Sequence, residues 1–137
     1  MKDRVFVDTN VLIYAYSGTE PEKKEKSLII LEKEDVMIST QVINEFIWNM
    51  HNKFQIDIET LKELTDRLFN RFRISFIEKN TISRALDLVR QYKYSYWDCL
   101  IIASALKNDC SSLYTEDMQH NLIIENKLRI VNPFTGL

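Results

Sequence analysis

Four acidic side chains are the residues of this sequence best suited to chemistry: Asp8, Glu45, Asp98 and Asp117. If they gather in the fold, the carboxylates repel one another and raise each other's pKa unless a cation neutralises them. A site made only of oxygen ligands selects hard ions such as Mg²⁺ or Mn²⁺. An ion held in this way activates water and clamps the oxygens of a phosphodiester. The four acids therefore predict metal-assisted hydrolysis of a phosphodiester.

Asp8 has the clearest local context. It follows an apolar run over residues 5–7 and precedes Thr9 and Asn10, after which the apolar pattern resumes. The β-branched and aromatic residues of the run favour a strand. Asp, Thr and Asn suit the start of a helix, because their side-chain oxygens accept backbone N–H bonds. Open α/β sheets place ligand sites at the carboxyl ends of strands, so Asp8 is either a site residue or only a helix cap.

Asp98 and Asp117 also lie at the ends of predicted elements. Asp98 opens a helix predicted over residues 97–108 and shares a face with apolar residues, where a bare charge is costly. It either sits at the helix start because the dipole favours an acid there, or binds a metal. Asp117 follows a strand predicted over residues 113–115, on a loop where an acid can be simply solvated.

Glu45 is placed less directly. It lies early in a helix predicted over residues 40–54, roughly opposite the stripe that contains Ile43 and Met50. Periodicity alone predicts a solvent-facing side chain. Glu45 is also within two turns of the preceding strand, however, so it can point across the top of the sheet. In a parallel sheet the positions of all four acids lie along one rim.

The elements that position these acids alternate along the chain. Strands are predicted over residues 5–7, 36–39, 74–77, 113–115 and 129–131, and helices over residues 9–16, 21–33, 40–54, 56–72, 81–92 and 97–108. Short apolar strands alternating with helices indicate a parallel sheet covered on both faces. We predict a single α/β domain over residues 1–137: a three-layer α/β/α sandwich with a central parallel sheet of four or five short strands.

Helical spacing also predicts which residues of two helices face the core. On the helix over residues 21–33 the apolar face comprises Leu28, Ile29 and Leu31. On the helix over residues 81–92 the inward residues are Ile82, Ala85, Leu86 and Val89.

Composition excludes several functional classes. The only two glycines, Gly18 and Gly136, are far apart, which argues against a P-loop or a dinucleotide-binding loop. Cys99 and Cys110 match no zinc pattern, and we expect both to be small buried groups. The net charge of −2 does not indicate a nucleic-acid binder, so that function would need local basic patches or bound metal. Without a signal peptide or membrane-spanning segment, a cytoplasmic protein that does not bind membranes is expected.

The motifs that contain these acids resemble those of PIN-domain ribonucleases of the VapC toxin type. The matching segments, in the order of that family, are V-D-T-N with Asp8, S-T-Q-V-I-N-E with Glu45, Y-W-D-C-L-I-I-A-S-A with Asp98, and L-Y-T-E-D with Thr115 and Asp117. The closing I-V-N-P-F over residues 130–134 is also similar. The order and spacing of these motifs are more specific than any one of them, and the similarity spans essentially the whole chain.

The resemblance implies Mg²⁺- or Mn²⁺-dependent cleavage of RNA. Asp8, Glu45, Asp98 and Asp117 would hold the metal, and Thr115 would orient water or a ligand by hydrogen bonding. Attack by a metal-activated water would leave a 5′-phosphate and a 3′-hydroxyl. Toxins of this type usually form homodimers and are silenced by a cognate antitoxin, often through a peptide whose Arg or Lys enters the acidic groove and can displace metal.

Two departures from the family pattern bear on the last motif. Many relatives carry glycine after the T-x-D segment, whereas this chain has Asn121 nearby, and asparagine tolerates a positive φ better than most residues. Glu116 stands beside Asp117, so the fourth acid is ambiguous; Asp117 matches T-x-D, but Glu116 can substitute.

Two other functions remain open on the sequence. A haloacid-dehalogenase-like phosphatase also begins with an acid at a strand end, but that family requires D-x-D and the third residue here is Asn10. A non-catalytic PIN-like module that binds RNA or protein is the second alternative, and the presence of all four acids weighs against it. His51 and His120 are expected to be surface residues, while Trp48 and Trp97 suit base stacking, the core or a dimer interface.

Overall fold

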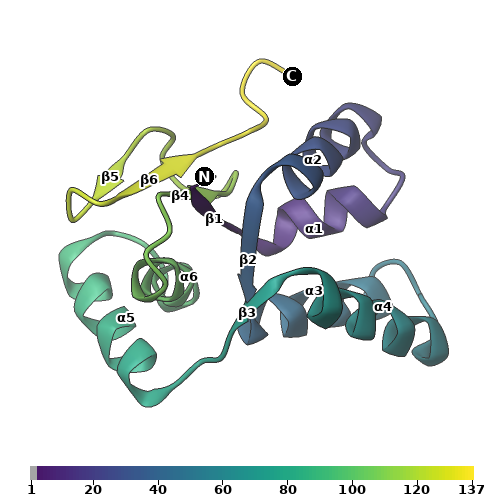
Figure 1. Ribbon diagram of the computed structural model, residues 1–137, viewed down its shortest axis with the longest axis horizontal. Coiled ribbons are helices and arrows are strands. Elements are labelled where there is room, and N and C mark those ends of the chain that lie inside the picture. Colours follow the sequence, from purple (N-terminus) through teal and green to yellow (C-terminus); the bar gives the residue numbers. More distant parts are fainter. Residues whose placement is uncertain (1–2) are drawn as a thin grey trace.

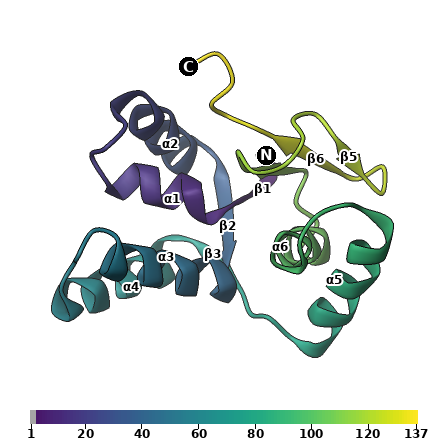
Figure 2. The same ribbon diagram turned by 180° about the vertical axis from the view of Figure 1, so that it is seen from behind.

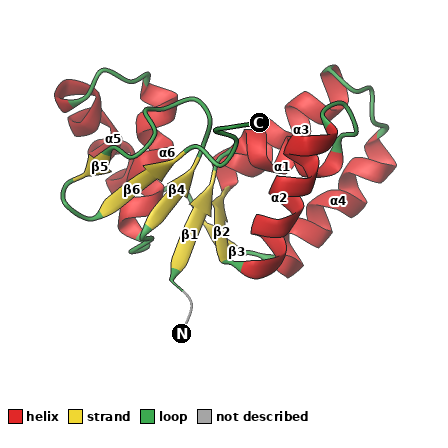
Figure 3. Cartoon of the chain, turned by 90° about the horizontal axis from the view of Figure 1, so that it is seen from above, coloured by secondary structure: helices red, strands yellow, loops and turns green. Residues whose placement is uncertain are grey.

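A central sheet of six strands organises the computed structural model, which describes residues 3–137 (Figure 1). In order across the sheet the strands are β3 (Arg73–Ser75), β2 (Asp35–Ser39), β1 (Arg4–Val7), β4 (Ser112–Tyr114), β6 (Leu128–Val131) and β5 (Ile123–Ile124). The first five are parallel to their neighbours, and β5 is antiparallel to β6. Figure 3 shows β1, β4 and β6 running in one direction, with their carboxyl ends away from the N-terminus.

Helices cover both faces of the sheet, as the sequence predicted. They are α1 (Thr9–Tyr16), α2 (Pro21–Lys33), α3 (Thr40–Asn52), α4 (Ile58–Arg71), α5 (Lys79–Gln91) and α6 (Tyr96–Lys107). Figures 1 and 2 show α5 and α6 together on one side and α1 to α4 on the other. The prediction of a parallel α/β/α sandwich is therefore confirmed.

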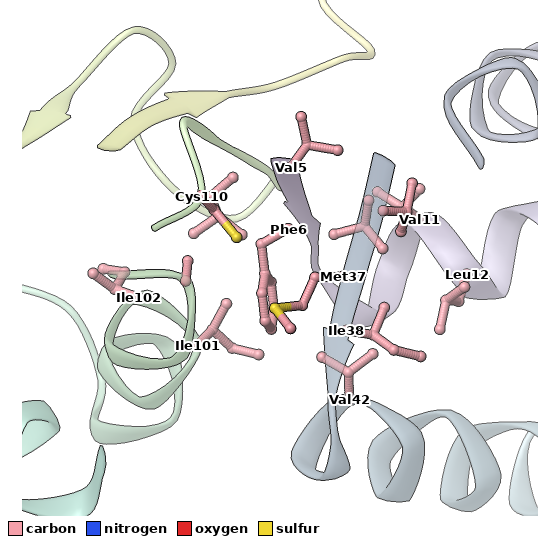
Figure 4. Packing of buried hydrophobic residues seen from close by; sticks show 14 of the residues in the cluster. Val5, Phe6, Val11, Leu12, Met37, Ile38, Val42, Ile101, Ile102 and Cys110 are labelled. Atoms are coloured by element: carbon pink, nitrogen blue, oxygen red, sulfur yellow. The ribbon is translucent and has the colours of Figure 1, made fainter. Parts of the chain in front are cut away.

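The sheet is apolar on both faces because it is buried on both faces. Residues 5–7 of β1 are all buried. Figure 4 shows Phe6 and Met37 near Ile101 of α6, whereas Ile38 lies towards Leu12 and Val42 of the opposite layer. Such a strand has no polar face, which is why it reads as an unbroken apolar run in the sequence.

The short strand β5 was not predicted. It contains two residues and returns to β6 through Glu125 and Asn126, which both have a positive φ, of 52° and 55°. The Lys127 N–H donates to the Ile124 carbonyl at 3.0 Å and closes the turn. Two consecutive positive φ values define the hairpin turn that asparagine-glycine usually makes, and Glu-Asn is a weak signal for it.

The predicted inward face of α5 is largely wrong. Ala85 is fully buried, but Ile82, Leu86 and Val89 are 41%, 55% and 38% exposed, and Leu88 is buried in their place. The helix packs on α6 in the outer part of its layer, so it buries only a narrow face. Periodicity cannot choose between two overlapping apolar stripes on one helix.

The buried face of α2 also differs from the predicted one, by about one residue. Leu31 is buried as predicted, together with Ile30, but Leu28 and Ile29 are 42% and 43% exposed. Cys99 and Cys110 are both free and buried, which confirms the prediction made for them. No helix within residues 3–137 is long and apolar enough to span a membrane.

Candidate active site

One small cavity brings the four predicted acids together at the carboxyl ends of the strands. The cavity has a volume of about 100 Å³, and Asp8, Glu45, Asp98 and Asp117 all line it. The other lining residues are Thr9, Asn10, Gln41, Asn49, Trp97 and Ile101. Among the residues described, none that lines this cavity carries a positive charge. Four carboxylates therefore line one cavity, and no described residue that lines it supplies a positive charge to neutralise them.

Asp8 is both the cap of α1 and the most buried acid of the cavity. It is the N-cap residue, and its Oδ1 accepts the Thr9 N–H at 2.7 Å. Only 6% of the residue is exposed. The pKa of Asp8 is raised to about 7, chiefly by burial and in smaller part by the charges of Asp117 and Glu45, while its hydrogen bonds from Thr115 and Thr9 oppose the rise. The two interpretations that the sequence left open are thus compatible.

Thr115 joins two of the acids from directly after β4. Its buried Oγ1 donates to Asp8 Oδ2 at 2.7 Å and accepts the Asp117 N–H at 3.1 Å. The backbone N–H of Thr115 donates to the Val131 carbonyl of β6 at 3.0 Å. The position of the hydroxyl is therefore fixed by the backbone bond to β6 and by its hydrogen bonds with Asp8 and Asp117.

Glu45 reaches the cavity from α3, which begins immediately after β2 with Ser39 as its N-cap. Its Oε1 accepts the Thr9 hydroxyl at 3.3 Å. Burial raises the pKa of Glu45, and the charges of Asp98 and Asp117 add to this effect. Glu45 is half-buried and lines the cavity, so of the two positions that the sequence left open it takes the one across the top of the sheet.

Asp98 lies in the first turn of α6, but it does not cap that helix. Ser95 is the N-cap, and its Oγ accepts the Asp98 N–H at 3.1 Å. The Asp98 carboxylate is half-buried, and burial and the Asp117 charge raise its pKa. Its side chain is thus available to the cavity.

The structure separates Asp117 from Glu116. Asp117 Oδ2 accepts the Asn10 amide at 2.8 Å and the residue lines the cavity. Glu116 is held away from the cavity by Lys23, whose Nζ lies 3.0 Å from its Oε2, and by a hydrogen bond from the Tyr14 hydroxyl. The geometry therefore favours Asp117 as the fourth acid. Asn121 has a φ of 69°, so the asparagine does supply the turn for which relatives use glycine.

Sequence reasoning missed two amides of the cavity wall, Gln41 and Asn49. They lie four residues before and four residues after Glu45, and residues at that spacing share one face of a helix. This spacing was the available signal. Gln41 donates to the Trp97 carbonyl at 3.1 Å, which links α3 to the first turn of α6.

The two histidines play no part in the cavity. His51 and His120 are both exposed, as the sequence predicted. The ring of His51 contacts the Ile56 carbonyl at 3.0 Å, and the ring of His120 accepts the Asn132 N–H at 2.9 Å. Both imidazoles therefore serve local backbone contacts.

All the ionisable side chains that line the cavity are carboxylates, which suit a hard divalent ion. Burial raises the pKa of all four acids, and the charges of other cavity acids raise the pKa of Asp8, Glu45 and Asp98 further; a cation relieves that repulsion. Within residues 3–137, no three acidic, histidine or cysteine side chains are close enough to ligate one ion together. The arrangement thus fits an ion held by one or two carboxylates with water in its other positions, as Mg²⁺ usually is.

Fold and sequence together define the class of this protein. The sequence profile of the PIN domain matches residues 5–123, so the chain belongs to the PIN domain family. No curated protein matches it.

Solved structures share the fold over nearly the whole chain. The toxin–antitoxin complex from Klebsiella pneumoniae matches with a TM-score of 0.72 and 23% identity, covering 95% of this chain and 98% of the other. Mycobacterium tuberculosis VapC20, a sarcin-ricin loop cleaving toxin, has a TM-score of 0.66 and 20% identity over 82% and 91%. VapBC2 from Rickettsia felis, bound to promoter DNA, has a TM-score of 0.66 and 16% identity over 94% and 99%. These likenesses show that the fold is that of VapC toxins.

Proposed function

We propose that this chain is a metal-dependent endoribonuclease and the toxin of a toxin–antitoxin pair. The observation that carries the proposal is the single cavity lined by Asp8, Glu45, Asp98 and Asp117, with no positive charge among its described lining residues. Membership of the PIN domain family supports a nuclease. The fold shared with VapC20, which cleaves the sarcin-ricin loop, favours RNA as the substrate.

Each site residue has a distinct role in this proposal. Asp8, Glu45, Asp98 and Asp117 would hold Mg²⁺ or Mn²⁺ between them, one or two directly and the others through water, and Asn10 orients the Asp117 carboxylate through its amide. Thr115 orients Asp8 and the Asp117 backbone through one hydroxyl. When bound, the divalent ion would neutralise the carboxylates, polarise the phosphate and make water more acidic. In the cavity the chain itself supplies positioning and negative charge.

The reaction is hydrolysis of one phosphodiester bond. The oxygen of water bonds to phosphorus, the bond from phosphorus to the 3′ oxygen breaks, and that oxygen takes up a proton. The products are a 5′-phosphate and a 3′-hydroxyl.

Two protein partners belong to the same proposal. The first is a cognate antitoxin, because the Klebsiella pneumoniae and Rickettsia felis structures are toxin–antitoxin complexes. A basic side chain of such a partner would neutralise the acid cavity. The second is another copy of this chain, and the exposed apolar stripe of α5 formed by Ile82, Leu86 and Val89 supports a homodimer.

The test is an incubation of the purified chain with total RNA in Mg²⁺, Mn²⁺ or EDTA. We expect discrete cuts with either metal, and none in EDTA or with Asp8→Asn or Asp98→Asn. Asp66→Asn is the matched control, because Asp66 is exposed on α4 and does not line the cavity. Metal-dependent cleavage that survives Asp98→Asn unchanged would overturn the site assignment.

A non-catalytic PIN module is the second candidate, favoured by the lack of three closely grouped ligands among the described residues. Tight RNA binding with no turnover in Mn²⁺ would identify it. The phosphatase alternative is set aside, because the chain belongs to the PIN domain family.

A further inference from the structure

Trp97 both lines the acid cavity and is exposed to solvent. It stands next to Asp98 in the chain, and 62% of the residue is exposed. An exposed aromatic side chain keeps apolar area that contact with a ligand can remove from water. The rest of α6 from Cys99 to Leu106 is buried, so Trp97 is the point at which this helix presents apolar surface to the solvent next to the acids.

One contact fixes the backbone of Trp97 and another orients its ring. Gln41 donates its amide to the Trp97 carbonyl at 3.1 Å and fixes the backbone of the first turn of α6. The half-buried Tyr96 ring packs edge-on against the indole, with centroids 5.3 Å apart and planes at 70°. Because 62% of Trp97 is exposed, most of its surface stays open to solvent. The side chain is therefore oriented but not covered.

Electrostatics explains why an aromatic group is useful at this point. The cavity wall carries four carboxylates, and the whole chain has a net charge of −2. Both features oppose a polyanion, so phosphate contacts alone give little affinity near the cavity. Stacking of a base on an aromatic ring needs no charge and works with every base, because each has a π face.

We propose that Trp97 is a stacking platform for a base of single-stranded RNA next to the scissile phosphate. The inference rests on the proposed nuclease function and narrows its substrate to RNA whose bases are unpaired at the cleavage site. A base within a duplex is stacked on both sides and cannot use the platform.

The first test uses the fact that Trp97 and Trp48 are the only tryptophans. Trp48 is 68% exposed on α3 and does not line the cavity, which makes it a matched control. Trp48→Phe leaves Trp97 as the sole indole, and Trp97→Phe leaves Trp48. In EDTA, an unstructured RNA of about 12 nucleotides should quench the emission of Trp97 saturably and that of Trp48 little. Inorganic polyphosphate, which has charge but no bases, should quench neither. Equal quenching of both indoles, or by polyphosphate, would overturn the proposal.

The second test measures RNA affinity by fluorescence anisotropy in EDTA. Trp97→Ala should weaken binding by roughly 5- to 100-fold, the range expected for loss of one stacked base. Trp97→Phe should retain most of the affinity, and Trp48→Ala all of it. Equal affinities for Trp97→Ala and Trp48→Ala, or no RNA binding by the unmodified chain, would overturn the proposal.

Two outcomes separate this inference from its premise. Selective quenching of Trp97 without any metal-dependent cleavage would reject the nuclease and keep the platform. Cleavage and binding that are unchanged by Trp97→Ala would keep the nuclease and reject the platform. If Trp97→Ala instead converts a dimer into a monomer on light scattering without RNA, the indole is a protein contact and the inference is wrong.

Discussion

The hydroxyl of Thr115 donates a hydrogen bond of 2.7 Å to Asp8 Oδ2 across 107 residues of sequence. Both residues are buried, and they follow adjacent parallel strands, β1 and β4. The same hydroxyl accepts the Asp117 N–H at 3.1 Å. One buried side chain thus holds the deepest acid of the cavity and the backbone of another acid.

Thr115→Val is expected to destabilise the protein by about 1–3 kcal/mol, because a buried carboxylate oxygen and the Asp117 N–H both lose this partner. Thr115→Ser keeps the hydroxyl and should cost less. Urea unfolding of the three proteins at neutral pH measures the difference. A larger loss for serine than for valine would mean that the threonine methyl group, which valine keeps, carries the stabilisation rather than the hydrogen bond.

The stability of the metal-free protein should fall as pH rises from about 4 to about 7. The pKa of Asp8 is about 7 in the folded state against an ordinary 3.8, so the folded state binds the proton more tightly. Protonation therefore favours folding, and ionisation costs on the order of a few kcal/mol. Asp8→Asn removes this titration, so it should flatten the profile and be the more stable protein above pH 7.

Thermal unfolding in EDTA across this pH range checks that prediction. The exposed Asp66→Asn should keep the profile of the unmodified chain. Glu45, Asp98 and Asp117 also have raised pKa values, so a smaller slope should persist in Asp8→Asn. A profile that Asp8→Asn leaves unchanged would show that Asp8 is not the buried charge that limits stability.

Asp117 and Glu116 should differ in their effect on metal binding. Asp117→Asn is expected to weaken Mn²⁺ binding by at least the 10- to 100-fold typical of changes around a metal site. Glu116→Gln should leave the affinity unchanged, because Glu116 is paired with Lys23 away from the cavity. Calorimetric titration of Mn²⁺ into each variant measures the two affinities. A larger loss of affinity in Glu116→Gln than in Asp117→Asn would identify Glu116 as the ligand.

Leu86→Lys should shift the chain from dimer to monomer. Leu86 is 55% exposed, between Ile82 and Val89 on the outer face of α5, and a buried lysine at a homodimer interface is strongly unfavourable. Asp87→Lys adds a lysine on a different side of the same helix and serves as control. Light scattering gives the mass, and an unchanged melting temperature shows that the fold is intact. A monomeric unmodified chain would refute the homodimer.

Local chemistry made part of the site predictable. A buried strand that ends in Asp-Thr-Asn before an apolar helix specifies its own geometry, so Asp8 could be placed at the carboxyl end of β1 and at the cap of α1 from neighbouring residues alone. The burial of α6 was predictable in the same way, because apolar residues on nearly every side of a helix indicate that it is buried.

Other parts depended on contacts that sequence spacing does not encode. Helical periodicity predicted that Glu45 faces solvent, because periodicity identifies only the side of α3 that packs on the core. The outer faces of α2 and α5 were misjudged since both helices carry more apolar residues than one neighbour can cover. The turn that forms β5 depends on two positive φ values at residues with no strong preference for them.

The sequence by itself determined the alternation of strands and helices, the parallel sheet and the four acids at the ends of its elements, because these follow from local propensity and apolar spacing. Only the tertiary structure decided that the acids share one cavity, that Asp117 rather than Glu116 faces it, and that Gln41 and Trp97 line it. These relationships depend on strand order and on pairing with Lys23, Thr115 and Asn10, which join residues far apart in the chain.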